Sequence, residues 1–149
     1  MEHTKKRKTS RKSARRAFRG SKKRFQTEAS PKIRSEHSLG RFAELCLRAR
    51  LVSMGFETCF PEHDSLGYDA VVIHESRAIK IQVKASSLNC GWRFITKGYE
   101  RIDIVACFCD GADEFYLIPG KKCTDNVYIP EDGINDWGRY REAWKMIHD

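Results

Sequence analysis

Apolar residues follow a helical period at the start of the part of the chain that carries a clear pattern. Spacings of three and four residues connect Leu39, Phe42, Ala43, Cys46, Leu47 and Ala49. Ser38 is a suitable N-cap for this segment, and Gly55 is suited to the C′ position that follows a helix. We therefore predict one amphipathic helix from about Ser38 to Met54.

The pattern then changes to that of β-strands. The runs 68–73 and 78–84 are predicted to be two strands joined by a tight turn at Glu75 and Ser76, which makes a β-hairpin. Further strands are predicted at residues 92–95, 102–109, 115–118 and 127–129. Residues 137–147 carry enough apolar positions for a closing helix. The order helix, several strands, helix predicts an α/β sandwich with a mixed sheet.

The first 35 residues lack either period. Their few large apolar residues are Phe18, Phe25 and Ile33, which bury too little surface to offset the entropy lost on ordering. The full chain of 149 residues is about the size of one ordinary domain. We therefore expect a basic disordered tail at residues 1–35 and a single domain at residues 36–149.

Charge divides the chain in the same place. Residues 1–34 hold 14 Lys/Arg and two acids, a net charge of +12, whereas the remainder holds 14 Lys/Arg and 18 Asp/Glu, a net charge of −4. Clustered cations release counterions from phosphate backbones, so the tail is interpreted as an arm that binds nucleic acid. A solubilising extension and a nuclear import signal have the same composition and stay open as alternatives.

Hydropathy and cysteine usage bear on the compartment. The chain contains no stretch approaching the roughly 20 apolar residues of a membrane span, and its basic N-terminus precedes no apolar signal region. We expect a cytoplasmic protein without membrane contact, nucleoid-associated if bacterial and nuclear if eukaryotic. The six cysteines lie inside otherwise apolar segments and are expected to be reduced thiols in the core. Cys107 and Cys109 form the one close pair, and without a second pair or a nearby histidine they do not predict a zinc site.

Polar residues suited to phosphodiester hydrolysis gather on the predicted hairpin. Gln82 and Lys84 are two apart on a strand, so their side chains leave the same face. If Glu75 and Ser76 form a two-residue loop, Asp69 lies opposite Gln82 and on the same face, whereas a slip of one residue would reverse it. Oxygen ligands for a hard cation, next to an ammonium, are what metal-assisted hydrolysis of a phosphodiester requires.

These residues also resemble a known motif. Tyr68-Asp69, followed after a hairpin by Ile81-Gln82-Val83-Lys84, resembles the motif of the PD-(D/E)XK nuclease superfamily, closest to the intron-associated homing endonucleases with a QxK motif. The segment from Gly40 to Glu44 is similar to the Gly-x-x-x-Glu helix ahead of that motif, and segments 103–106 and 115–119 are similar to the later strands. The resemblance covers about residues 38–119. It implies a restriction-endonuclease-like mixed β-sheet flanked by α-helices.

The resemblance also implies a role for each site residue. Asp69 would be the principal Mg²⁺ ligand, with Mn²⁺ as a substitute ion, and Gln82 and the Val83 carbonyl would complete the inner shell. Glu44 would support metal or water from the helix, and Lys84 would position the attacking water. The implied activity is a DNA endonuclease of homing, junction or mismatch type that acts on duplex DNA. Cutting both strands would call for a homo-oligomer, a dimer or higher.

Two departures from the motif keep other functions open. Tyr68 stands where the motif has a proline, and Gln82 removes one carboxylate, which weakens the hold on a divalent cation. A catalytically inactive nucleic-acid-binding protein that retains the nuclease fold is the first alternative. A small RNA-binding protein whose tail does most of the binding is the second. Glu44 has an ordinary interpretation as well, in helix-surface ion pairs with Arg41 and Arg48.

Overall fold

The computed structural model describes residues 35–62 and 67–149, so all but the last residue of the expected tail lies outside the described residues, and the tail stays a prediction. The described elements in chain order are α1 (Glu36–Ser53), β1 (Glu57–Cys59), β2 (Ala70–His74), β3 (Arg77–Ser86), β4 (Trp92–Ile95), β5 (Ile104–Cys109), β6 (Glu114–Pro119), η2 (Gly120–Lys122), β7 (Asn126–Ile129), η3 (Asp136–Tyr140) and η4 (Trp144–Ile147).

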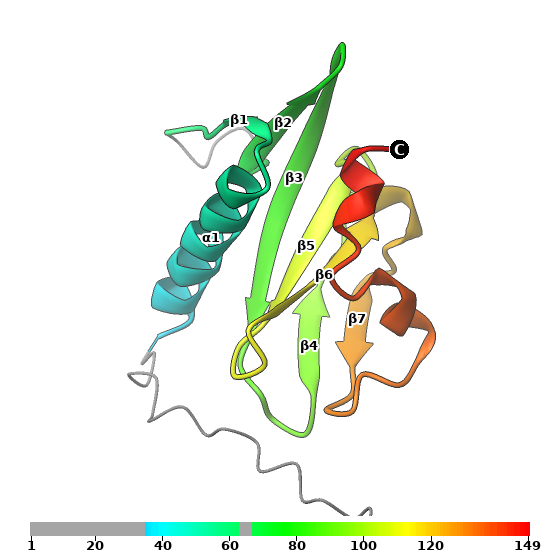
Figure 1. The fold of residues 1–149 in the computed structure, drawn as a ribbon. Coiled ribbons are helices and arrows are strands. Elements are labelled where there is room, and N and C mark those ends of the chain that lie inside the picture. The colour runs from blue at the N-terminus through cyan, green and yellow to red at the C-terminus, as the bar shows by residue number, and fades with distance from the viewer. Residues whose placement is uncertain (1–34, 63–66) are drawn as a thin grey trace, which may run out of the picture. The chain divides into compact units, whose positions relative to one another are not determined.

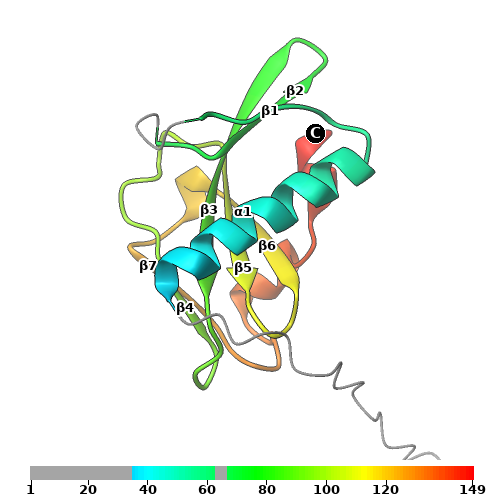
Figure 2. The same ribbon diagram turned by 90° about the vertical axis from the view of Figure 1, so that its left-hand side faces the viewer.

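Five strands form one mixed sheet in the order β1-β2-β3-β5-β6 (Figure 1). β3 and β5 run parallel, and the other neighbours are antiparallel. α1 crosses one face of this sheet, and β4 and β7 pair as a separate two-stranded ribbon on the other side (Figure 2). The predicted mixed α/β architecture is confirmed.

α1 begins earlier than predicted. The N-cap is Ser35, whose side-chain oxygen accepts a hydrogen bond from the Ser38 backbone N–H, so the expected cap at Ser38 is wrong by three residues. Both serines satisfy the local requirement for an N-cap, so the sequence pattern alone does not distinguish them. Gly55 follows the helix with φ +79°, as predicted for C′. Within the described residues, no helix is both long and apolar enough to cross a membrane.

Alternation along the strands builds a separate core on each face of the sheet. Toward α1, Ile104, Ala106 and Phe108 of β5 pack with the buried face of the helix. Toward the ribbon, Val105 and Cys107 of β5 pack with the buried side chains of β4 and β7. All six residues of β5 are therefore buried, which explains why this strand is apolar without alternation.

The predicted hairpin is confirmed. His74 pairs with Arg77 across a two-residue turn, and the same register pairs Ala70 with Ile81. Glu75 in the turn has φ +49°, the left-handed conformation that such turns require. The observed register is the one that the turn predicts, and the ladder ends at the Ala70–Ile81 pair, next to Asp69 and Gln82.

The predicted closing helix at residues 137–147 is wrong. The segment forms two short 3-10 helices, η3 and η4, instead of one α-helix. Glu142 between them has φ +48°, which no α-helix accommodates, and its backbone N–H donates to the Phe115 carbonyl at 2.8 Å. A hydrogen bond to β6 therefore replaces the helical bond that the apolar pattern predicted.

Glu142 joins three distant parts of the chain. Its carboxylate accepts hydrogen bonds from Arg50 of α1 at 2.7 Å, from the Phe115 N–H at 2.6 Å and from the Trp144 indole at 2.7 Å. The side chains of Arg50 and Glu142 are 24% and 35% exposed, so this ion pair is partly shielded from water. Removing the carboxylate would leave three donors without their acceptor.

The Glu142→Ala variant is expected to lose about 2–3 kcal/mol of stability, below the cost of breaking a fully buried pair because water still reaches the site. That loss corresponds to a melting temperature lower by roughly 10 °C. Thermal unfolding followed by circular dichroism measures it. Glu114→Ala is the matched control, since it removes an ion pair to Arg141, whose side chain is 51% exposed, and should cost less than about 1 kcal/mol. Equal losses in the two variants would contradict the role given to Glu142.

The cysteines are free thiols in the described structure. Burial raises the pKa of Cys107 and Cys109 above the usual thiol value, and it raises the pKa of Cys123 to about 11, so all three are neutral at physiological pH. Cys59 and Cys90 are exposed. The prediction of reduced thiols is confirmed, whereas their placement in the core is wrong for these two.

Candidate active site

Asp69 lies just before β2, and its backbone bonds to Ile81 of β3, the residue that pairs with Ala70. The Asp69 backbone N–H donates to the Ile81 carbonyl at 2.8 Å. Its side-chain oxygen Oδ2 accepts two hydrogen bonds at 2.6 Å, one from the Val83 backbone N–H and one from Nε2 of Gln82. The strand pairing therefore holds this half-buried carboxylate against the segment that carries the rest of the motif.

Gln82 connects two of the oxygens expected to bind metal. Its Nε2 donates to Asp69 Oδ2 and also lies 3.3 Å from the Val83 carbonyl oxygen. A single amide group thus bridges a carboxylate and a backbone carbonyl. The structure brings together three of the four residues predicted as metal ligands, Asp69, Gln82 and Val83.

Strand register decides which face of the sheet carries these side chains. Gln82 pairs with Val105 and Lys84 pairs with Cys107, and both partners belong to the core beneath the β4–β7 ribbon. The side chains of paired residues share a face, so Gln82 and Lys84 lie on the ribbon side. α1 packs on the opposite face. Gln82 and Lys84 are half-buried rather than fully exposed.

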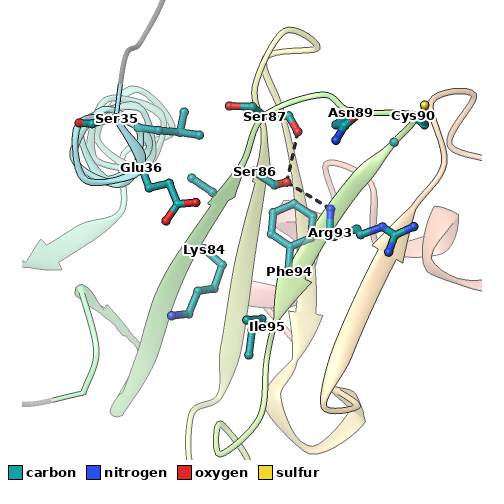
Figure 3. Close-up of a pocket in the computed structure, with 13 residues that line it drawn as sticks. Ser35, Glu36, Lys84, Ser86, Ser87, Asn89, Cys90, Arg93, Phe94 and Ile95 are labelled. Atoms are coloured by element: carbon teal, nitrogen blue, oxygen red, sulfur yellow. Dashed lines mark hydrogen bonds between the residues drawn. The ribbon is translucent and has the colours of Figure 1, made fainter.

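Lys84 faces an open cavity of about 980 Å³ between the start of α1, the end of β3 and β4. Its Nζ lies 5.0 Å from the centroid of the Tyr99 ring, an attractive contact for an ammonium. Figure 3 shows Lys84 on β3 with Phe94 and Ile95 of β4 beside it. The ammonium is therefore held next to a space that admits a ligand.

Glu44 is placed differently from the other predicted ligands. It lies on α1, and its carboxylate bonds to Arg41 one turn earlier at 2.9 Å. Among the described residues, no hydrogen bond joins Glu44 to Gln82 or Lys84. The Arg41 side chain is 63% exposed, so this ion pair contributes little stability. The Glu44 carboxylate can therefore leave Arg41 for another partner at little energetic cost. A metal-supporting role for Glu44 stays a prediction.

Sequence reasoning missed three residues beside Lys84. Glu36 and Arg93 line the same cavity, and Figure 3 shows the Glu36 carboxylate directed from α1 toward the strand that carries Lys84. Tyr99 supplies the ring below the ammonium. In the sequence, Glu36 is an ordinary acid in the first turn of a helix, and neither Arg93 nor Tyr99 lies within the motif. Only packing brings the three to this place.

The donor set is compatible with a small hard cation. Asp69 offers a carboxylate oxygen, Val83 a carbonyl oxygen and Gln82 an amide oxygen, the oxygen ligands that Mg²⁺ prefers. A half-turn of the Gln82 amide would exchange its N–H donors for the oxygen, which would then be available as a metal ligand without movement of the backbone. In the described residues, no group of three or more His, Cys, Asp and Glu side chains could hold a metal. The set therefore depends on amide and backbone oxygens.

The chain has similar proteins among the solved structures. No family model matches the chain, and no curated protein sequence matches it. Among solved structures, the chain is similar to a bacterial homing endonuclease, I-Ssp6803I, with 25% sequence identity and a TM-score of 0.65, over 76% of this chain and 91% of that chain. The match spans almost the whole of the other protein. The chain therefore has a nuclease-like α/β fold of the kind found in that homing endonuclease.

Proposed function

We propose that this protein is a Mg²⁺-dependent DNA endonuclease with an active site of the PD-(D/E)XK type in its QxK form. The observation that carries the proposal is the contact of Asp69 Oδ2 with both the Val83 N–H and the Gln82 amide, two residues from Lys84 on the same strand. The similarity in fold to a homing endonuclease supports the same function.

Each residue has a separate task in the proposed reaction. Asp69, Gln82 and the Val83 carbonyl would hold the ion, which would supply positive charge beside the phosphate and the attacking water. Lys84 orients the attacking water and offsets the negative charge that develops on the phosphate. Attack of the water oxygen on phosphorus breaks one P–O bond of the backbone and leaves the phosphate on one fragment and a hydroxyl on the other.

Glu44 is proposed to support the metal or its water from the helix, which packs on the sheet face opposite Gln82 and Lys84. Glu44 would give up its ion pair with Arg41 and bond to a water of the metal shell. This change costs little, because the Arg41 side of the pair is exposed to solvent. Glu44 would then hold a water rather than a direct metal bond. Mn²⁺ should replace Mg²⁺, since both accept oxygen ligands in octahedral geometry.

The substrate is proposed to lie in the cavity beside Lys84. The cavity is open, and Ser86, Ser87 and Asn89 add hydroxyl and amide groups to its lining. Such groups bind phosphate and sugar oxygens of a nucleic-acid strand. One such site in each chain cuts one strand, so a cut through both strands calls for a homodimer or a higher assembly.

One observation favours the inactive alternative. The Gln82 amide donates a hydrogen bond to Asp69, at the position where the motif otherwise has a second carboxylate to bind the metal. A neutral amide holds a divalent cation less tightly than a carboxylate does. A protein that binds nucleic acid through this fold without cutting it has the same contacts in the absence of metal. Metal-dependent cleavage separates the two functions.

The test is conversion of supercoiled plasmid by the purified full chain in Mg²⁺, in Mn²⁺ and in EDTA. Four-way junctions and mismatched duplexes serve as further substrates, because specificity is not a property of the fold. Nicked or linear products in Mg²⁺ and Mn²⁺, and none in EDTA, are expected. Nicked products alone would indicate a monomer acting on one strand. Binding without cleavage on every substrate would support the inactive alternative instead.

A further inference from the structure

The β4–β7 ribbon has one buried and one outward face. Arg93 pairs with Tyr128 and Ile95 pairs with Asn126, and the Thr96 N–H continues the pairing to the Asp125 carbonyl at 3.0 Å. Alternate side chains are buried against the main sheet. The outward face consists of six exposed residues, Arg93, Ile95, Lys97, Thr124, Asn126 and Tyr128. No other described element covers this face.

The chemistry of the outward face suits a nucleic acid. It carries two cations, Arg93 and Lys97, an amide, two hydroxyls and one apolar side chain, Ile95, which is 74% exposed. It carries no carboxylate, although residues 35–149 are acidic overall, with 14 Lys/Arg and 18 Asp/Glu. Ile95 and the Tyr128 ring are the two large hydrophobic groups exposed on this face, too few for a stable protein interface, whereas positive charge complements phosphate.

Arg93 is held in place before any partner binds. Its guanidinium lies 5.5 Å from the Tyr128 ring centroid, and the Tyr128 hydroxyl donates to the Cys90 carbonyl at 2.6 Å. Gly91, at φ +110°, leaves room for that side chain, because a Cβ there would lie 2.7 Å from the Cε2 carbon and the hydroxyl oxygen of Tyr128. Because the Tyr128 ring is fixed by the hydrogen bond of its hydroxyl, the arginine above it is already restricted and loses less conformational entropy on binding.

The ribbon is attached to the strand that carries the candidate active site. The Arg93 backbone N–H donates to the Ser86 hydroxyl at 3.1 Å, and Ser86 lies two residues beyond Lys84 on β3. Arg93 and Ile95 also line the cavity that Lys84 faces (Figure 3). A duplex whose backbone reached Lys84 would therefore extend past the ribbon.

We propose that the outward face of the β4–β7 ribbon reads base edges in the major groove of duplex DNA, with Arg93 contacting guanine. The proposal rests on the proposed DNA-directed function and adds a surface for specificity. A two-stranded ribbon fits a groove about 12 Å wide, and arginine matches the O6 and N7 acceptors of guanine. Asn126 suits adenine, and Ile95 suits the thymine methyl group.

The test is binding of the full chain, in EDTA, to a randomised duplex library, followed by sequencing of the recovered duplexes. Cleavage does not enter this measurement. The wild type is expected to enrich guanine at one position of the recovered duplexes. The Arg93→Ala variant is expected to prefer that guanine roughly 10- to 100-fold less than the wild type does. Replacing that guanine by 7-deazaguanine, which lacks N7, should weaken binding of the wild type and leave binding of Arg93→Ala nearly unchanged.

Arg139→Ala is the matched control. Arg139 is also an exposed arginine over a tyrosine, 5.4 Å from the Tyr140 ring, but it belongs to η3 rather than to the ribbon. Its substitution should leave the base preference unchanged. An unchanged preference in Arg93→Ala, or an equal effect of 7-deazaguanine on wild type and variant, would overturn the proposal. A variant that loses self-association in sedimentation while keeping its base preference would mark the face as a protein interface and overturn it as well.

The two proposals fail in different ways. If the protein cuts no plasmid but shows a guanine preference that depends on Arg93, the nuclease proposal is refuted and the proposal of base readout by the ribbon is supported. If the wild type cuts in a metal-dependent way but shows no base preference, the nuclease proposal is supported and the proposal of base readout by the ribbon is refuted. The measurements share no step beyond the purified protein.

Discussion

The Lys84→Ala variant is expected to lose about 10²- to 10³-fold of Mg²⁺-dependent cleavage, the effect of removing one group that stabilises transition-state charge. The substitution removes a half-buried ammonium that lies 5.0 Å from the Tyr99 ring and faces the cavity. It breaks no hydrogen bond or ion pair among the described residues. The rate of plasmid nicking at saturating Mg²⁺ measures the loss. The free energy of unfolding should stay within about 1 kcal/mol of the wild-type value.

Lys80→Ala is the matched control for this variant. Lys80 lies four residues earlier on β3, on the same face, and its Nζ lies 5.7 Å from the Tyr68 ring. It does not line the cavity beside Lys84. Its removal should change cleavage by less than about threefold, as expected for an exposed charge. Equal losses for Lys80→Ala and Lys84→Ala would point to general phosphate attraction rather than to a catalytic lysine.

The Asp69→Asn variant is expected to lose about 10³-fold of cleavage, corresponding to roughly 4 kcal/mol of metal-dependent stabilisation of the transition state. Asparagine keeps an oxygen that can accept from the Val83 N–H, so the pairing around the site survives. The neutral amide lowers metal affinity. Wild type should therefore melt at a higher temperature in Mg²⁺, by roughly 10 °C when Mg²⁺ exceeds the dissociation constant about 100-fold, and the variant should not.

Asp103→Asn separates this effect from loss of an ordinary carboxylate. Asp103 is exposed and, like Asp69, accepts a hydrogen bond from a backbone N–H of β3, that of Lys80 at 2.8 Å. It lies outside the metal set. Asp103→Asn should keep both cleavage and the Mg²⁺-induced rise in melting temperature. A Mg²⁺ response that persists in Asp69→Asn would exclude Asp69 as the principal ligand.

The sequence determined the features that depend on local chemistry. The helical period and Gly55 gave the helix and its end, and alternation or short apolar runs gave strands β2 to β7 to within about two residues. The two-residue turn at Glu75 and Ser76 set the register of the hairpin, because a turn of fixed length allows one pairing. That register, a local property, brings Asp69 to Gln82.

Short elements escaped sequence reasoning. β1 has three residues and pairs with β2 at the edge of the sheet, which is too short for a period to show. The closing segment carries a helical apolar pattern, but Glu142 turns its backbone to bond with Phe115 and its carboxylate to bond with Arg50. Long-range hydrogen bonds therefore override local propensity there.

Only the tertiary structure decided what surrounds Lys84. The motif fixes Gln82 and Lys84 on one strand face, yet the cavity is assembled from α1, the end of β3 and β4. Glu36 and Arg93 are far from each other in sequence and carry no local signal of this meeting. The sequence alone determined a candidate set of metal-binding oxygens, because a hairpin register follows from adjacent residues. The substrate-facing surface depends on how separate elements pack, and no adjacent pattern encodes that packing.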